Sequence, residues 1–285
     1  MRLYTKPGAF AAWPLVTMAL PLASLAVLTF CVARPETLGI SLQKLYMTWS
    51  PYHYGAQAYG LAVLYSYRSG CRLLPADKRL LFWTSMLPFL NMAIVTEGLG
   101  LRWLLPAAVF SPAPVSTGLS ALGWALAAAA FAGPPLLFLK VWKGPSGPMP
   151  LIALMAVVSN TVWFFVLQPM QAMVWATVFH GLQYLAIVLV FHVRDRKVGT
   201  SSRGGALREG VRFYAISLGL AYALFLVLPR AYVALGYGPV ESVLVVVAAI
   251  NIHHFIVDAY IWRLRKADPN RSIVDSLAAP ARAIA

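Results

Sequence analysis

Residues 239–262, PVESVLVVVAAINIHHFIVDAYIW, decide the fold class of this chain. The stretch is long enough to cross a bilayer as a helix, which takes about 20 mostly apolar residues. It holds two acidic residues, Glu241 and Asp258, and no basic one. Its polar residues, among them His253 and His254, are costly in hydrocarbon unless they face other helices. The stretch therefore predicts a membrane-spanning helix with a polar face turned toward a helical bundle.

The whole chain has the same apolar character as this stretch. It has 285 residues, of which 60% are hydrophobic and 11% charged, and its mean hydropathy is +0.71. A soluble domain is about a quarter charged, so this composition excludes a soluble enzyme, a coiled coil and a disordered chain. The two cysteines, Cys31 and Cys71, form neither a disulfide framework nor a zinc pattern. We predict an all-α protein, a polytopic integral membrane helical bundle.

Apolar runs of spanning length occur eight times along the chain. We expect them to form a single transmembrane domain over residues 1–266, followed by a short cytoplasmic tail at 267–285. The longest polar segment, residues 194–208, is rich in glycine and serine and is expected to be a flexible cytoplasmic link. The expected spans lie near residues 13–32, 47–67, 80–103, 117–139, 148–168, 172–193, 213–235 and 239–262.

The net charge of +14 is interpreted as a topology signal. Cytoplasmic loops of membrane proteins collect lysine and arginine. With the N-terminus in the cytoplasm, 19 of the 23 basic residues fall in cytoplasmic segments and four in outer ones. This bias predicts that both termini are cytoplasmic and that the protein lies in the inner (cytoplasmic) membrane. Nucleic acid is not an expected partner, because no basic stripe with interleaved aromatic residues lies outside the bilayer. The four outer basic residues are Arg34, Lys44, Arg102 and Arg230.

Three expected spans repeat one pattern, a histidine followed four residues later by another polar side chain. Residues four apart lie on one face of a helix, so each pair points the same way. His253 is turned about 100° from His254, so a regular helix aims only one of them at a small site. We favour His254, with His253 contributing if the helix is rotated or distorted. The pairs are His53 with Gln57, His180 with Tyr184, and His254 with Asp258.

These residue types favour a metal site inside the membrane. Neutral imidazole binds iron, zinc or copper, and a neighbouring polar group can orient the ring. Two or three histidines with one carboxylate and open positions are the ligands of non-heme iron oxygenases. We expect a metal ion, iron first and copper or zinc as alternatives. The expected ligands are His53, His180 and His254, with His253 as a further candidate and Asp258 or Glu97 as the carboxylate. Gln57, Tyr184 and Asp258 are the expected catalytic or orienting groups.

The segments that carry these histidines are similar to those of uncharacterised bacterial polytopic membrane proteins with a terminal Asn-x-His-His-x-x-x-Asp-x-x-Ile-Trp-Arg helix. Here that helix segment is residues 251–263, and its companions are residues 49–57 and 180–184. The architecture also resembles the Brp/Blh-type membrane carotenoid-cleaving dioxygenases, which hold a non-heme iron with histidines from several helices. This chain lacks the closely paired histidine segments of that family. The resemblance implies an iron-dependent oxygenase.

The first functional hypothesis is therefore a metal-dependent membrane oxidoreductase acting on a lipid or another hydrophobic small molecule such as an isoprenoid. A transporter or proton-coupled carrier that uses the same polar residues is the second hypothesis. The third is a non-catalytic assembly or partner protein of a membrane complex. Buried histidines can also serve as hydrogen-bond partners between helices. Alternative structural roles are an Asp258–Arg263 pair, a Glu97–Arg102 pair near the headgroups, and an interfacial position for His192.

Overall fold

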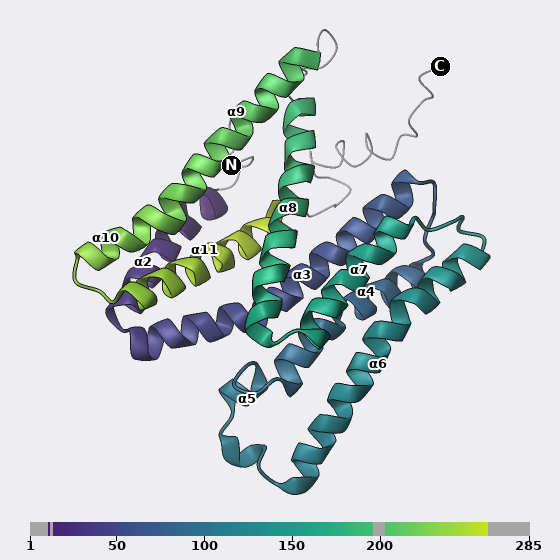
Figure 1. Ribbon diagram of the computed structural model, residues 1–285, viewed down its shortest axis with the longest axis horizontal. Coiled ribbons are helices and arrows are strands. Elements are labelled where there is room, and N and C mark those ends of the chain that lie inside the picture. The colour runs from purple at the N-terminus through teal and green to yellow at the C-terminus, as the bar shows by residue number, and fades with distance from the viewer. Residues whose placement is uncertain (1–10, 12–13, 196–202, 262–285) are drawn as a thin grey trace. The chain divides into compact units, whose positions relative to one another are not determined.

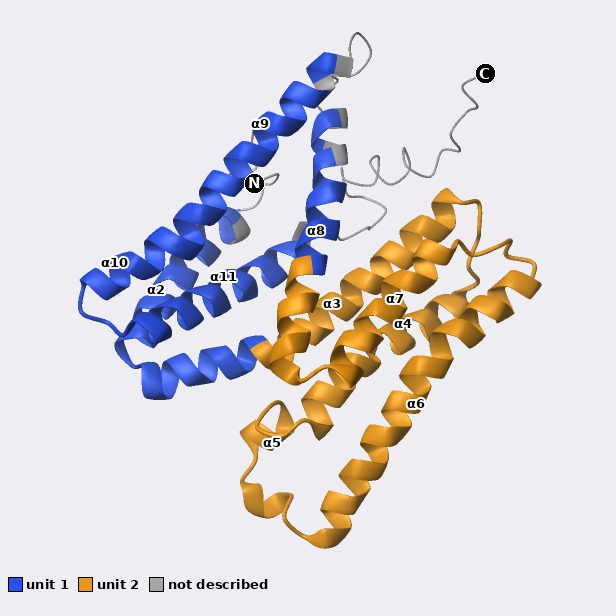
Figure 2. Ribbon diagram, in the orientation of Figure 1, with its two compact units in different colours: residues 1–46, 179–261 blue, residues 47–178, 262–285 orange. Residues whose placement is uncertain are grey.

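A computed structural model describes residue 11 and residues 14–195 and 203–261 (Figure 1). The described residues form helices joined by turns, and no strand occurs among them. This confirms the all-α class. The chain divides into two compact units, residues 1–46 with 179–261 and residues 47–178 with 262–285, called unit 1 and unit 2 (Figure 2). The expected tail at 267–285, Arg263 and residues 196–202 of the expected link lie outside the described residues.

Unit 1 is built around the packing of α2 (Leu20–Ala33) on α11 (Pro239–Ile261). Small and β-branched side chains allow these helices to lie close together, and Tyr232 of α10 (Leu228–Ala234) joins their core. The hydroxyl groups of Thr29 and Tyr232 lie 3.2 Å apart, which ties α2 to α10. Unit 1 also contains α9 (Arg203–Tyr222). Its core residues are Leu28, Cys31, Val32, Tyr232, Val245, Val246 and Ala249.

Unit 2 contains α4 (Pro75–Leu90), the short α5 (Leu101–Leu104), α6 (Ala113–Lys143) and α7 (Leu151–Val166). Helix α4 packs on both α6 and α7. At the end of the core, the buried carboxylate of Asp77 accepts a 2.7 Å hydrogen bond from the Lys140 ammonium group. The core residues are Ala62, Cys71, Leu73, Leu81, Leu137, Val141, Met149, Ala153 and Val157.

Two long helices run through both units. Helix α3 (Ile40–Arg68) begins in unit 1 and continues into unit 2, and α8 (Pro169–Asp195) begins in unit 2 and continues into unit 1. Short π-helical turns at Leu15–Ala19, Pro35–Gly39, Asn91–Val95 and Ala223–Val227 and a 3₁₀ turn at Ala107–Val109 complete the described elements.

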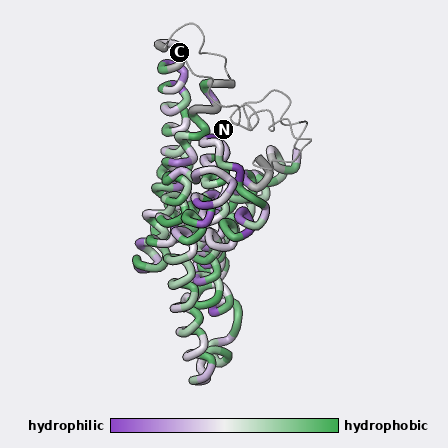
Figure 3. Tube along the Cα trace, turned by 90° about the vertical axis from the view of Figure 1, so that its right-hand side faces the viewer, coloured by the Kyte–Doolittle hydropathy of each residue, from purple (hydrophilic) through white to green (hydrophobic). Residues whose placement is uncertain are grey.

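Four described helical segments are long and apolar enough to cross a membrane. A fifth span is possible if the bent pair Thr17–Ala33 and Pro35–Arg68 counts as one. In Figure 3 hydrophobic residues, drawn in green, occur along the helices. The chain is therefore a helical membrane protein, but the structure supports four or five spans rather than the eight expected. The four segments are Ala113–Lys143, Pro169–Leu189, Leu207–Ala234 and Pro239–Asp258.

The expected span at 80–103 is not one helix. Helix α4 continues through the π-helical turn at Asn91–Val95 and ends before Thr96, whose backbone is extended. Gly98 and Gly100 then adopt positive φ angles of 71° and 52°, which L-residues rarely adopt. A Cβ atom on Gly100 would collide with the backbone of Ala93. The sequence prediction carried the span through these glycines because the run as a whole is largely apolar.

The expected span at 148–168 is a helix of only 16 residues, Leu151–Val166. At 1.5 Å per residue its length is about 24 Å, less than the roughly 30 Å of a hydrocarbon core. Pro150 immediately precedes the helix, and Leu167 at its end has an extended backbone. The apolar run is therefore longer than the helix it forms.

The first two expected spans form a sharply bent pair. The axes of Thr17–Ala33 and Pro35–Arg68 differ by 116°. Arg34 at the bend has φ −132° and ψ 62°, outside the helical region, and Pro35 starts the next helical turn. A Cβ on Gly39 would lie 3.1 Å from Val245 Cγ2 and 3.2 Å from the Cys31 carbonyl oxygen. Gly39 therefore lets the start of the second helix approach α2 and α11 closely.

Candidate metal site

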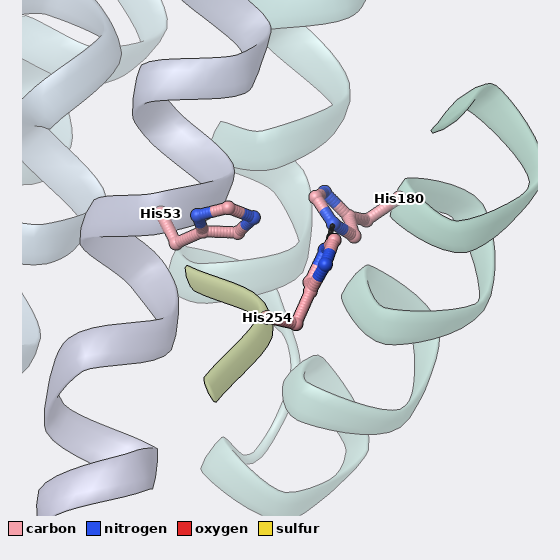
Figure 4. Close-up of side chains that lie close together, drawn as sticks. All are labelled: His53, His180 and His254. Atoms are coloured by element: carbon pink, nitrogen blue, oxygen red, sulfur yellow. Dashed lines mark hydrogen bonds between the residues drawn. The ribbon is translucent and has the colours of Figure 1, made fainter. Parts of the chain in front are cut away.

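The polar faces of α8 and α11 meet in unit 1. The Nε2 atoms of His180 and His254 lie 3.5 Å apart, and their side chains point toward one another from the two helices (Figure 4). One turn further along both helices, the Tyr184 hydroxyl donates a 3.1 Å hydrogen bond to Oδ1 of Asp258. Both contacts join residues that are 74 positions apart. The two helices therefore run in the same direction here, with their polar residues in register.

These four side chains form a compact group in largely apolar helices. His180 is 7% exposed and Asp258 is 6% exposed. The Tyr184 ring stands perpendicular to the His254 ring, with centroids 5.2 Å apart, and it stacks on the His180 ring at 6.3 Å. Buried polar groups of this kind are expensive in a membrane interior and are retained where they bind or react. The group is therefore a candidate functional site.

The spacing of the two imidazole nitrogens can be tested against a metal ion. A nitrogen ligand lies about 2.1 Å from zinc or a similar ion, so two ligands at a tetrahedral angle are about 3.4 Å apart. The observed 3.5 Å agrees with that value. A strong hydrogen bond between nitrogen and its acceptor is shorter, about 2.7–3.2 Å. The His180–His254 pair therefore has the spacing of two ligands of one ion.

His53 completes a group of three histidines that could hold a metal ion, each offering one ring nitrogen (Figure 4). It belongs to α3 and is 8% exposed. Within unit 2, the next residue on α3, Tyr54, is buried, and its hydroxyl lies 2.7 Å from Oγ1 of Thr177 on α8. This contact fixes α3 against the part of α8 that precedes His180. The three histidines are the three that the sequence pattern nominated first.

The other expected site residues take separate positions. Gln57 lies one turn after His53 on α3 and is half-buried. His253 is not part of the histidine group, and its Nε2 is buried with no hydrogen-bond partner among the described residues. Glu97 has a side chain that is 88% exposed and 3.2 Å from Arg102. This confirms the alternative that paired Glu97 with Arg102, and it leaves Asp258 as the carboxylate near the histidines.

Two further polar residues have structural roles. The Asn251 amide donates to the carbonyl oxygen of Val247 in its own helix at 2.8 Å. The Nε2 atom of His192 lies 3.0 Å from the Glu209 carboxylate of α9, and its ring packs against Phe213 at 4.4 Å. Both residues therefore take part in helix packing in unit 1. From the sequence, His192 was expected to have a structural role, and these contacts agree with it.

Sequence reasoning missed Thr177 and gave Tyr54 no specific role. Their positions in the sequence could have indicated them, because Tyr54 is adjacent to His53 and Thr177 lies one helical turn before His180. A comparison with protein-family models found no match, and neither did searches of curated proteins and of solved structures. The chemistry of the site is therefore argued from its own geometry.

Proposed function

We propose that this chain is an integral membrane, metal-dependent oxidoreductase of the non-heme iron oxygenase type. His53, His180 and His254 are its metal ligands, and its substrate is a lipid or isoprenoid. The observation that carries the proposal is the pair of Nε2 atoms 3.5 Å apart on in-register helices, with His53 as the third member of the group. Iron is the first choice of metal, with copper or zinc as alternatives.

The continuity of α3 supports the place of His53 in this set. Within unit 1, Tyr46 near the start of α3 stacks on Phe255, the residue after His254, with ring centroids 6.2 Å apart. His53 follows Tyr46 by seven residues, which is about two turns of one helix. Tyr46 and His53 therefore share a face of α3. At Tyr46 this face contacts α11 through Phe255.

The continuity of α8 gives a second, independent support. Within unit 2, the Tyr54–Thr177 contact brings α3 and α8 together. His180 follows Thr177 by three residues on the same uninterrupted helix, and His53 precedes Tyr54. Both helices therefore carry a histidine within one turn of their point of contact. Three helices that each bring one imidazole to a bundle interior are a common way to build a metal site.

A hydrophobic substrate suits the surroundings of His180. Val178, Phe179 and Leu182 flank it on α8, and all three are exposed apolar side chains. In a bilayer such residues contact lipid, so an apolar chain can approach the site from the membrane itself. Dioxygen is the proposed oxidant. This chemistry is also the one expected from the resemblance to the Brp/Blh-type dioxygenases.

Metal analysis of the detergent-purified protein tests the proposal. We expect near-stoichiometric iron by elemental mass spectrometry, and its loss in His53→Ala, His180→Ala and His254→Ala variants that still fold. His192→Ala is the matched control, because His192 lies on the same helix as His180 but pairs with Glu209. Unchanged metal content in all three variants would refute the site. Incorporation of ¹⁸O₂ into an extracted membrane lipid, lost with the metal, tests the reaction class.

The proposal includes a topology. We propose eight crossings of the inner membrane, with α4 and α7 crossing despite their length and both termini in the cytoplasm. The 19-to-4 distribution of basic residues supports this orientation. Reporter fusions after residues 37, 110 and 285 distinguish the two sides. Activity of a periplasmic reporter at 285 would overturn the orientation.

The bent pair of helices favours a carrier as the second candidate function. Carriers commonly use broken helices, and the 116° bend at Arg34–Pro35 is such a break. A carrier predicts uptake of a solute or proton flux into proteoliposomes without turnover of lipid. Flux that persists in a metal-free His180→Ala variant would support the carrier over the oxidoreductase.

A further inference from the structure

We infer that Asp258 is itself a metal ligand through its Oδ2 oxygen, and that Tyr184 is the positioning residue that holds its other oxygen. The inference rests on the proposed function, since it adds a donor to the same site. The sequence pattern left Asp258 two roles, the carboxylate ligand or an orienting group, and the geometry points to the first. All four residues of the argument, His180, Tyr184, His254 and Asp258, lie in unit 1.

The position of Asp258 relative to the His254 ring carries the argument. A carboxylate that orients a metal-bound histidine accepts a hydrogen bond from the ring nitrogen that does not bind the metal. Here Oδ2 of Asp258 lies 3.5 Å from Nε2 of His254. This is the same nitrogen that faces Nε2 of His180. Asp258 therefore stands on the metal side of the imidazole and not behind it.

The distances agree with a shared ion. Nε2 of His254 is 3.5 Å from Nε2 of His180 and 3.5 Å from Oδ2 of Asp258. Three donors that surround one ion at about 2.1 Å are separated by about 3.0–3.4 Å, depending on the bond angle. Both observed distances lie just above this range and beyond a good hydrogen bond. A small inward movement of each side chain gives coordination distances.

Tyr184 explains why the carboxylate presents only one oxygen. Its hydroxyl donates to Oδ1 at 3.1 Å, within the ordinary range of a hydrogen bond. Because Tyr184 follows His180 by four residues, one helix supplies both a ligand and the group that positions a ligand on the other helix. Oδ1 is thereby held by Tyr184, and the proposal gives Oδ2 to the ion, which predicts monodentate coordination by Asp258.

The added oxygen donor narrows the chemical class of the metal. Two histidines and one carboxylate on one side of an ion, with open positions opposite, are typical of ferrous iron sites that react with dioxygen. Among the described residues no cysteine belongs to the group, and thiolates are the ligands that select copper(I). Burial of the carboxylate is also less costly beside a divalent cation than alone. We therefore assign the site to divalent iron, with cobalt(II) as a usable spectroscopic substitute.

The test is titration of the purified, metal-depleted full chain with iron(II) and with cobalt(II). We expect Asp258→Asn to weaken binding at least 100-fold and to change the visible cobalt spectrum, while Asp258→Glu restores part of the affinity. Tyr184→Phe should weaken binding about 10–100-fold, as is usual for loss of a group that supports a ligand. Its cobalt spectrum should change as well, a response that a purely structural tyrosine would not give. Glu241→Gln, the other acidic residue of α11, is the matched control and should bind normally.

The outcomes separate this inference from the proposed function. If the wild-type chain binds neither ion, the metal site and the inference both fail. If His180→Ala abolishes binding but Asp258→Asn has wild-type affinity and an unchanged cobalt spectrum, the site stands and the carboxylate ligand is refuted. If Asp258→Asn does not fold, Asp258→Glu and Tyr184→Phe decide. Unchanged spectra in both of them would overturn the inference.

Discussion

The hydrogen bond between Tyr54 and Thr177 should control metal affinity as well as stability. It is the described contact that ties α3 to α8, at 2.7 Å between the two hydroxyl oxygens. His53 precedes Tyr54, and His180 follows Thr177 by one turn, so the bond lies beside two proposed ligands. Removing it with Tyr54→Phe or Thr177→Val preserves side-chain shape almost completely. The substitutions therefore test the bond rather than the packing.

The expected magnitude follows from the geometry. Hydrogen bonds between membrane helices contribute about 0.6 kcal/mol on average and up to about 1.7 kcal/mol. The 2.7 Å distance is optimal for two hydroxyl groups, so we expect a coupling of about 1 kcal/mol in a double-mutant cycle. If the bond holds the two helices at the spacing that the metal requires, its loss weakens metal binding by at most about fivefold. This factor corresponds to the coupling energy of about 1 kcal/mol.

The chain offers a matched control for this cycle. Thr29 and Tyr232 form a second threonine–tyrosine contact, at 3.2 Å between α2 and α10, among residues outside the histidine group. Thr29→Val with Tyr232→Phe should lower thermal stability in detergent without changing the metal Kd. The reasoning is refuted if the Tyr54 and Thr177 variants lose stability to the same extent as this control pair and bind metal with unchanged affinity.

Three further predictions address stability and reactivity. Burial and the Asp77 carboxylate raise the pKa of the Cys71 thiol, so less of the reactive thiolate forms at a given pH. Alkylation of Cys71 should therefore be slow at pH 8. Its rate should still rise at pH values where the alkylation rate of an exposed Ser69→Cys thiol no longer changes. Gly100→Ala should lower the thermal midpoint more than Gly98→Ala, because both have positive φ but only the Gly100 Cβ meets backbone atoms; equal shifts would contradict the collision with Ala93. Metal removal by a chelator should lower stability by about 2.7 kcal/mol relative to protein with free metal at 100 times Kd, and His180→Ala should show no such response.

The helical class and the grouping of the histidines could be predicted from the sequence for one reason. Both depend on local periodicity, since a run such as residues 239–262 specifies a helix and an i, i+4 pair such as His180–Tyr184 specifies a face. Helix ends were harder. Gly98 and Gly100 follow a helix end at Val95 with backbone angles that an apolar run does not reveal. Arg34–Pro35 introduces a bend between two segments that were expected to cross separately.

The role of Asp258 could not be predicted in the same way. The i, i+4 spacing places Asp258 beside His254, but it does not say which ring nitrogen the carboxylate approaches. That depends on the rotation of α11 against α8, which is fixed by contacts such as the packing of Val245, Val246 and Ala249 on α2. Long-range packing therefore decides between a ligand and an orienting group.

The common offset of 74 residues gives the site a further property. Because His180 with His254 and Tyr184 with Asp258 share one register, a one-residue slip between α8 and α11 would separate both pairs together. Such a slip rotates the contacting faces by about 100°. Metal binding therefore favours one register over its neighbours, and the ion would stabilise helix packing as well as supply chemistry. A site built in this way predicts that ligand substitutions loosen the α8–α11 contact. Cysteines introduced at Gln183 and Val257, which share the 74-residue offset, can measure this loosening by their cross-linking rates with and without metal.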